Sequence, residues 1–256
     1  MNPDFLTISV VSHNQGHLIR QLLNDVRAHL TLPFEVILTL NIKESFLLEP
    51  KEWGFPISQV INENPRGFSE NHNAAFHLAK GNFFCVLNPD IRLTEDPFPS
   101  LLACLKIIQV GVVAPMIVGP NGELEDSARC FPTPFRILCK AFGGCKGSDY
   151  VMQNEPIFPD WVGGMFMLFS RDVFKQLGGF NQRYFLYYED VDICARLRLQ
   201  GYEVALCPAA KVIHHARRSS HRNFKYLKWH LASMMRFFCS LPFLKICWLR
   251  LKKKYS

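Results

Sequence analysis

The stretch RYFLYYEDVDICARLRLQGYEVA, residues 183–205, joins an aromatic segment to a sequence typical of a helix. Three carboxylates, Glu189, Asp190 and Asp192, fall where this helix is expected to begin. The helix dipole favours acidic residues in a first turn, so capping alone explains them. The aromatic approach would also place them beside apolar walls, which raise the pKa of a carboxyl and suit it to act as a base. Capping, metal binding and acid–base chemistry all remain open here.

The rest of the chain alternates strand-like and helix-like segments. Apolar, β-branched runs predict strands at residues 6–13, 34–40, 57–63, 82–90 and 205–216. Apolar residues at helical spacing predict helices at residues 16–30, 70–81 and 191–201, the second ending at Gly81. Strands separated by helices indicate a mostly parallel α/β sheet, which binds its ligands at the carboxyl ends of the strands.

Polar residues occupy two of these predicted strand ends. The first strand ends in Ser12, His13 and Asn14, and the fourth ends in Asn88, Pro89 and Asp90. A carboxylate at a strand end is placed to hold Mg²⁺ or Mn²⁺ against a diphosphate, because both cations prefer oxygen ligands. Asn, Pro and Asp also favour simple turns, so the metal site is one of two interpretations.

The segment NENPRGFSENHNAAF, residues 62–76, is a weaker signal. Gly67 permits a tight backbone, and Asn71 and Asn73 offer amide groups near a helix start, where anions and polar ligands bind readily. Ordinary N-capping explains the same residue types.

Two adjacent histidines, His214 and His215, end the last predicted strand. A histidine in this place is a candidate for a metal ligand or a phosphate contact. From composition alone, a structural or surface role is the favoured interpretation.

Length and cysteine usage limit the class of protein. The 256 residues suffice for one large domain with an appendage. Nine cysteines, an odd number without a C-x-x-C pair, indicate free thiols in a reducing compartment. The N-terminal MNPDFLTISVVSHN has neither a basic start nor a long apolar run, so we expect no signal peptide and a cytoplasmic location.

The charge is concentrated at the C-terminus. Residues 211–256 hold 12 Lys and Arg and no acid, whereas the remainder holds 17 basic and 22 acidic residues. Basic and aromatic residues interleave in this tail, and its longest apolar stretch, residues 237–249, is too short to span a bilayer. The pattern favours an anionic membrane surface; a helix packed on the domain with a solvated basic face is the alternative. We expect no nucleic-acid partner.

Taken together, these features resemble the family 2 inverting glycosyltransferases of the GT-A fold. The branch it resembles most includes bacterial rhamnosyltransferases of O-antigen and cell-wall assembly. The resemblance rests on five segments: VVSHN (10–14), RGFSENHNAA (66–75), VLNPDI (86–91), the stretch WVGG to GYEV (161–204) and VIHH (212–215). It implies a catalytic domain over residues 1–215 and a basic amphipathic helical segment over residues 216–256.

The resemblance also implies residue roles. Asp90 takes the place of the last acid of a D-x-D motif and would bind the metal, with Asn88 where the first acid would be. His214 resembles the later metal or phosphate ligand. Asp190 matches the base that deprotonates the acceptor hydroxyl, with Glu189 as the alternative. Attack opposite the leaving nucleotide then inverts the anomeric centre.

The nucleotide-sugar pocket implied by the family combines several segments of the chain. Its expected residues are Ser12, His13, Asn14, Asn41, Gly67, Phe68, Asn71, Asn73, Asn88, Gly163 and Gly164. One departure concerns Leu40, which stands where relatives carry an Asp that helps to hold the nucleoside, although Asn41 is retained. This departure leaves the nucleotide open.

The predicted activity is metal-dependent transfer of L-rhamnose from dTDP-L-rhamnose, with Mg²⁺ or Mn²⁺ as cofactor. The acceptor would be a glycan carried on a polyprenyl diphosphate at the inner face of the cell membrane. Two alternatives are a UDP-sugar-dependent enzyme of the same family and a non-catalytic sugar-nucleotide or glycan-binding subunit. The sequence leaves the linkage and the oligomeric state undetermined.

Overall fold

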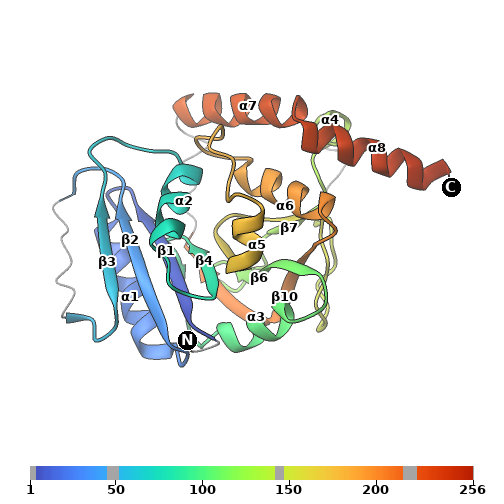
Figure 1. Ribbon diagram of the computed structural model, residues 1–256. Helices are drawn as coiled ribbons and strands as arrows, with labels where there is room; N and C mark the ends of the chain where they lie inside the picture. Colours follow the sequence, from blue (N-terminus) through green and yellow to red (C-terminus); the bar gives the residue numbers. More distant parts are fainter. Residues whose placement is uncertain (1–3, 45–51, 142–146, 216–223, 256) are drawn as a thin grey trace.

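The computed structural model describes residues 4–44, 52–141, 147–215 and 224–255 (Figure 1). Its centre is a sheet whose eight described strands follow the order β3-β2-β1-β4-β9-β6-β10-β5. These strands are β1 Leu6–Ser12, β2 Phe34–Leu40, β3 Ile57–Ile61, β4 Phe83–Leu87, β5 Ile91–Arg92, β6 Val110–Val118, β9 Phe166–Ser170 and β10 Glu203–His214. A separate ribbon pairs β7 Ala128–Arg129 with β8 Trp161–Val162. The helices are α1 Gly16–His29, α2 Phe68–Leu78, α3 Phe98–Leu105, α4 Pro134–Ala141, α5 Arg171–Gln176, α6 Glu189–Leu199, α7 Phe224–Phe238 and α8 Leu241–Tyr255.

The predicted mostly parallel α/β sheet is confirmed, with two reversed strands. Strands β1, β2, β3 and β4 pair in parallel, as do β6 and β10. β9 runs antiparallel to both β4 and β6, and the short β5 runs antiparallel to β10 at the edge. The N-terminal end of β9 therefore lies beside the C-terminal end of β4. A ligand site at this end of the sheet receives residues from both strands.

The predicted helix at residues 70–81 is shifted in the structure. It begins at Phe68 and ends at Leu78, with Ala79 as its C-terminal cap. Gly81 has a different role, because a Cβ atom there would lie 2.6 Å from the backbone N of Thr7. This glycine permits the close approach of two backbone segments.

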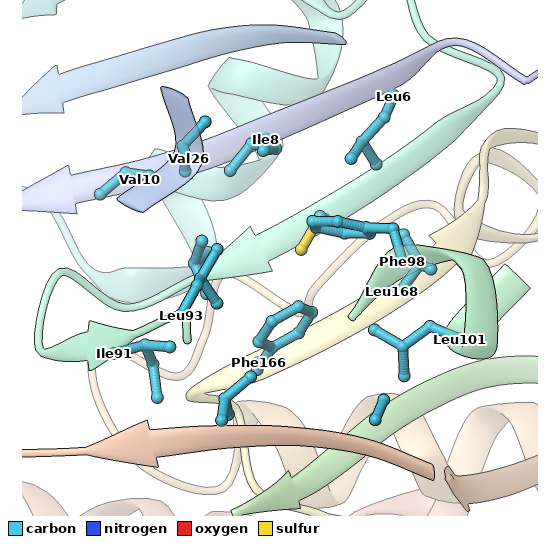
Figure 2. Packing of buried hydrophobic residues seen from close by; sticks show 14 of the residues in the cluster. Leu6, Ile8, Val10, Val26, Ile91, Leu93, Phe98, Leu101, Phe166 and Leu168 are labelled. Carbon is cyan, nitrogen blue, oxygen red and sulfur yellow. The ribbon is translucent and has the colours of Figure 1, made fainter. Parts of the chain in front are cut away.

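The core lies on both faces of the sheet. Leu6, Ile8 and Val10 of β1 share one cluster with Phe98 of α3 and Phe166 of β9 (Figure 2). Helices α1 and α3 cover this face, and helices α2, α5 and α6 cover the other. The apolar residues predicted for the first four strands supply much of this core.

The two C-terminal helices lie across α6 (Figure 1). Phe237 of α7 and Ile246 of α8 are buried in the core cluster on that face. In the described part of the chain no single helix is long and apolar enough to span a membrane; α7 and α8 reach that length only as a pair bent by 54°. The predicted domain boundary after residue 215 adjoins residues 216–223, which lie outside the described residues, and it stays a prediction.

Candidate active site

The three carboxylates of residues 189–192 have different surroundings. Helix α6 begins at Glu189, so all three lie in its first turn, as the sequence predicted. The Asp192 side chain is almost wholly buried and its Oδ2 lies 2.7 Å from Nε of Arg196. Arg196 in turn donates to the backbone oxygens of Leu177 and Gly179. Asp192 therefore joins α6 to the preceding loop.

Asp190 is held by backbone donors on both carboxylate oxygens. Its Oδ2 accepts from the N–H of Gly164 at 3.0 Å and its Oδ1 accepts from the N–H of Val191 at 2.8 Å. Burial raises the pKa of Asp190, while these N–H groups and the nearby Arg129 oppose the increase. The carboxylate is therefore fixed in direction and keeps stabilising partners for its charged form.

Glu189 has a less favourable environment for charge. Its side chain is buried, and Oε2 has no hydrogen-bond partner among the described residues. Burial, and to a smaller extent the negative charge of Asp190, raises the pKa of Glu189 well above its usual value. Of the two neighbouring carboxyls, Asp190 thus has more partners that favour its charged form.

The loop before these acids has an unusual backbone. Tyr187 and Tyr188 have φ angles of 70° and 66°, a left-handed conformation that costs free energy in residues with a Cβ atom. Helix α7 packs against this loop: the ring of His230 lies 5.2 Å from that of Tyr187 and 5.5 Å from that of Tyr188. Ser233 of α7 donates to the backbone oxygen of Leu186 at 2.9 Å. No sequence pattern had indicated that α7 would support this loop.

Asp90 and His214 are neighbours, as a shared metal site requires. Oδ2 of Asp90 lies 3.5 Å from Nε2 of His214, and Nδ1 of His214 lies 2.8 Å from Oε2 of Glu125. Burial lowers the pKa of His214, but the hydrogen bonds and charges of Asp90 and Glu125 outweigh it and raise the pKa to about 9. Glu125 orients the imidazole so that Nε2 faces Asp90, a role the sequence analysis did not assign.

These residues fit a divalent cation in one specific way. Oδ1 of Asp90 is buried and has no hydrogen-bond partner in the described structure. Such an oxygen is costly unless a ligand satisfies it. The described residues contain no group of three His, Cys, Asp or Glu side chains that could hold a metal ion. A cation held by Asp90 and His214 would therefore need diphosphate oxygens and water, as Mg²⁺ commonly uses.

Asp190 and the Asp90–His214 pair lie at the same end of the sheet, where β4 ends. Asn88 follows β4 and its N–H donates to the backbone oxygen of Met165 at 2.9 Å. The adjacent Gly164 donates to Asp190, so a single turn joins the end of β4 to the first turn of α6. A Cβ atom on Gly164 would lie 3.5 Å from the Phe68 ring and from Cβ of Asp190. The sequence-predicted Asn88, Gly163, Gly164 and Phe68 are thus gathered around this end of the sheet.

The predicted residues Ser12, His13 and Asn14 have different environments at the end of β1. Ser12 is buried, and its hydroxyl accepts from the N–H of Gln15 at 3.2 Å. His13 and Asn14 are exposed beyond the strand, and Asn14 has a left-handed φ of 58°. Oε1 of Glu44 accepts from the N–H of Asn14 at 2.8 Å, while Oε2 of Glu44 is buried without a hydrogen-bond partner among the described residues. The exposed pair are the groups a ligand could reach here, and Glu44 fixes the backbone of Asn14.

The predicted Asn41 and Asn71 belong to a buried amide network. The side-chain N–H₂ group of Asn62 donates to the Oδ1 atoms of Asn41 and Asn71, at 2.9 and 2.7 Å. Asn41 also binds both the N–H and the C=O of Arg66. The network fixes the loop between β3 and α2. Ligand contact by these two amides stays a prediction, since protein groups already bind them.

Asn73 and Gly67 have structural roles in the same region. Asn73 accepts from the N–H of Phe180 and donates to its C=O, across 107 residues of sequence. A Cβ atom on Gly67 would lie 2.7 Å from the backbone oxygen of Phe185, which accepts from the N–H of Phe68 at 2.8 Å. Both residues therefore join α2 to the loop that precedes Asp190.

Leu40 differs chemically from the acid that the resemblance led us to expect. It is the last residue of β2 and its side chain is buried in the core cluster below α1. A buried aliphatic side chain offers no acceptor to a nucleobase. Glu44, four residues later, provides the carboxylate in this part of the described structure.

A cavity of about 630 Å³ adjoins Asp190. Its walls come from the start of α6, the β7–β8 ribbon, α4 and α7. Asp190 and Glu189 share it with Arg129 and Arg136. Tyr226, Leu227, His230 and Met234 of α7 complete the wall on the side of the tail. This volume accommodates a small ligand next to the candidate base.

A mixed α/β sheet with its acids and a histidine gathered at one edge is the arrangement of a GT-A glycosyltransferase. The family model described as "Glycosyltransferase like family 2" matches residues 3–235, and the chain belongs to this family. Rhamnosyltransferase WbbL of Escherichia coli is 30% identical over 247 residues, covering 90% of this chain and 91% of that protein. An N-acetylglucosaminyl-diphospho-decaprenol L-rhamnosyltransferase of Mycobacterium tuberculosis is 32% identical over 148 residues, 54% of this chain and 48% of that protein.

Solved structures confirm the GT-A fold at low sequence identity. GalNAc-T7 with UDP, GalNAc and Mn²⁺ superimposes with a TM-score of 0.67 at 17% identity, covering 83% of this chain and 43% of that chain. The mannosyltransferase PcManGT of Pyrobaculum calidifontis, with GDP-Man and Mn²⁺, gives 0.59 at 18% identity over 90% and 64% of the chains. The protein is therefore a family 2 glycosyltransferase that acts on glycan precursors.

Proposed function

We propose that the protein transfers L-rhamnose from dTDP-L-rhamnose to a hydroxyl of a glycan carried on a polyprenyl diphosphate, with inversion. The observation that carries this proposal is Asp190, a directed carboxylate at the wall of a cavity large enough for an acceptor sugar. Rhamnose is proposed because the names of both bacterial relatives include it, and the lipid diphosphate because the name of the mycobacterial relative includes diphospho-decaprenol.

In the proposed reaction Asp190 accepts the proton of the acceptor hydroxyl as that oxygen attacks the anomeric carbon. The bond to the nucleotide diphosphate breaks on the opposite face, so one displacement inverts the centre. The N–H groups of Gly164 and Val191 fix the carboxylate at the wall of the cavity. Burial and the charge of Asp190 raise the pKa of Glu189 well above its usual value, which disfavours a second negative charge beside the base.

The donor diphosphate is proposed to bind beside Asp90 and His214, where the buried Oδ1 of Asp90 lacks a partner. Mg²⁺ or Mn²⁺, when bound there, supplies positive charge that stabilises the departing diphosphate. Glu125 keeps the imidazole of His214 aligned toward Asp90. His13, Asn14 and Glu44 are placed to meet the nucleoside at the end of β1.

We further propose that α7 and α8 rest on the inner face of the cell membrane. Both helices expose large apolar side chains: Leu227, Leu231, Met235, Leu241, Leu244, Trp248 and Leu251. Residues 204–256 contain no acidic residue, so the basic side chains there meet no competing carboxylate from their own segment. Exposed apolar and basic residues on one helix pair favour an anionic lipid surface.

A transfer assay tests the proposed function. The protein is incubated with Mn²⁺, a prenyl-diphosphate-linked N-acetylglucosamine and either dTDP-L-rhamnose or UDP-glucose, and the products are identified by mass spectrometry. We expect one deoxyhexose to be added from the dTDP donor and no product from the UDP donor. Transfer from UDP-glucose alone would refute the rhamnose assignment while leaving the family activity intact.

The buried Leu40 supports a second candidate, a non-catalytic subunit that binds a sugar nucleotide or a glycan. Without an acid at this position the nucleoside loses one acceptor. The same assay separates the candidates, because a binding subunit would bind dTDP or glycan and give no product with either donor.

A further inference from the structure

Arginine side chains occupy the cavity beside Asp190 at two separate walls. Arg129 belongs to β7, and Arg136 belongs to α4. The family activity described above assigns no role to either residue. Two guanidinium groups in one cavity, next to a candidate base, require an explanation because an arginine always carries its charge.

Arg136 is fixed by a nearly buried acid. Its Nη2 lies 2.6 Å from Oδ1 of Asp149, whose side chain is only 8% exposed, while the arginine itself is 37% exposed. Oδ2 of Asp149 accepts from the N–H of Cys130. The acid is thus held by two partners, and it orients Arg136, which lines the cavity and remains partly exposed.

Arg129 is fixed in a similar way on β7. Its Nε donates to the backbone oxygen of Asp126 at 2.9 Å and lies 3.0 Å from the Asp126 carboxylate. Its guanidinium carbon lies 5.6 Å from the centre of the Trp161 ring. Both arginine side chains are therefore already ordered before a ligand binds. This ordering reduces the conformational entropy lost when their terminal nitrogens bind an anion.

Apolar residues continue from the arginines toward the outside. Ile137 of α4 and Leu227 and Met234 of α7 line the cavity. On the same two helices Phe135 and Leu138, and Leu231 and Met235, are exposed. Figure 1 shows α4 beside the junction of α7 and α8. The cavity therefore lies between α7, which belongs to the proposed membrane-facing surface, and α4, which exposes two further apolar side chains.

We propose that this cavity binds the acceptor lipid, with Arg136 and Arg129 holding its diphosphate and α4 and α7 contacting the first isoprenoid units. The proposal rests on the proposed function and names the acceptor subsite. In the prenyl-diphosphate-linked N-acetylglucosamine of the transfer assay, one sugar separates the reacting hydroxyl from the diphosphate. The anion of that acceptor must bind a sugar's length from Asp190, and the cavity of about 630 Å³ has room for this arrangement. Paired arginines suit a diphosphate because each guanidinium can donate two parallel hydrogen bonds.

Binding of farnesyl diphosphate to the full chain tests the proposal without requiring turnover. Affinity is measured by calorimetry for wild type, Arg136→Gln and Arg129→Gln, with inorganic pyrophosphate and farnesol as comparison probes. Losing one charge-assisted contact should weaken farnesyl diphosphate binding by about tenfold to a hundredfold. Lys228→Gln is the matched control, because Lys228 is an exposed cation on α7 that does not line the cavity; it should change the affinity by less than about twofold.

Folding and donor binding are controlled in the same samples. Arg136→Lys keeps a cation beside Asp149 but removes the fork, so it should fold as wild type and still bind the probe more weakly. Binding of dTDP with Mn²⁺ should be unchanged in every variant. Wild-type affinity for farnesyl diphosphate in both glutamine variants would overturn the inference, as would equal affinity for inorganic pyrophosphate or displacement of the probe by dTDP.

The failure of this inference is distinguishable from failure of the proposed function. Sugar transfer to a prenyl-diphosphate acceptor, together with normal farnesyl diphosphate binding in the arginine variants, would refute only the subsite. Absence of both dTDP binding and transfer in wild type would refute the proposed function itself.

Discussion

Asp90 and Asp190 lie at the same edge of the sheet but depend on different parts of the chain. The backbone of Asp90 is bonded to the end of the sheet: its C=O accepts from the N–H of His215 at 2.9 Å, and the next residue, Ile91, pairs with His214. Asp190 instead follows the left-handed Tyr187 and Tyr188, whose rings pack against α7. Strand pairing thus fixes the candidate metal ligand, whereas a helix from the tail supports the candidate base.

This difference separates donor binding from transfer. Changes at the metal side should weaken nucleotide binding, and changes in α7 should affect transfer while the donor still binds. A helix that holds the base and also contributes to the proposed membrane surface would connect acceptor binding with the position of Asp190.

The largest expected effect comes from Asp190→Asn. Loss of a general base lowers turnover by about 10²- to 10⁴-fold, while dTDP binding with Mn²⁺ should be unchanged. Turnover and calorimetry on the same preparation check both parts. Glu189→Gln is the matched control and should retain most activity; a larger loss in that variant than in Asp190→Asn would transfer the role of base to Glu189.

Phe237→Ala should show how far the base depends on α7. Phe237 is fully buried, 5.7 Å from the ring of Tyr188, so its truncation should lower the free energy of unfolding by about 3–5 kcal/mol. Turnover should fall at a temperature where the protein remains folded, with little change in dTDP affinity. Trp248→Ala, at an exposed position on α8, is the control for stability. Equal stability of the two variants would show that α7 does not support the loop.

Glu125→Gln should have an intermediate effect on the metal side. Because Glu125 orients His214, its loss should weaken Mn²⁺-dependent dTDP binding by about tenfold to a hundredfold. Titration of dTDP at several Mn²⁺ concentrations measures the change. An unchanged Mn²⁺ requirement would show that Glu125 does not contribute to metal binding.

The smallest effect concerns the pH dependence of turnover. The base must be deprotonated, and burial raises the pKa of Asp190, so activity is present above that pKa and is lost as the pH falls through it. Activity should therefore begin to fall at a higher pH than it would with an ordinary aspartate, whose pKa is about 3.9. A pH–rate profile of kcat measures it. In Glu189→Gln the acidic limb should persist, and its disappearance would contradict the assignment of Asp190.

Much of the metal side could be predicted because it depends on strand ends. A parallel sheet gathers the carboxyl ends of its strands, so these two strand ends were expected at the same end of the sheet, and the family resemblance assigned Asp90 and His214 to one metal site. Glu125 could not be predicted, since it meets His214 across 89 residues and precedes no recognisable motif.

The base side and the amide network show where sequence reasoning stops. Tyrosine rarely has a positive φ, so nothing in the aromatic run indicated the strained backbone at Tyr187 and Tyr188. Asn73 was predicted as a ligand contact from its residue type, yet both ends of its amide bind Phe180. Only long-range packing distinguishes an amide that binds a ligand from one that joins two segments.

The central claim, that Asp90 serves the donor and Asp190 serves the acceptor, is tested most directly by one calorimetric series. dTDP is titrated into wild type, Asp90→Asn and Asp190→Asn, each with and without Mn²⁺. The account predicts Mn²⁺-dependent binding in wild type and in Asp190→Asn, and its loss in Asp90→Asn. Mn²⁺-dependent binding that survives in Asp90→Asn, or that disappears in Asp190→Asn, would contradict the account.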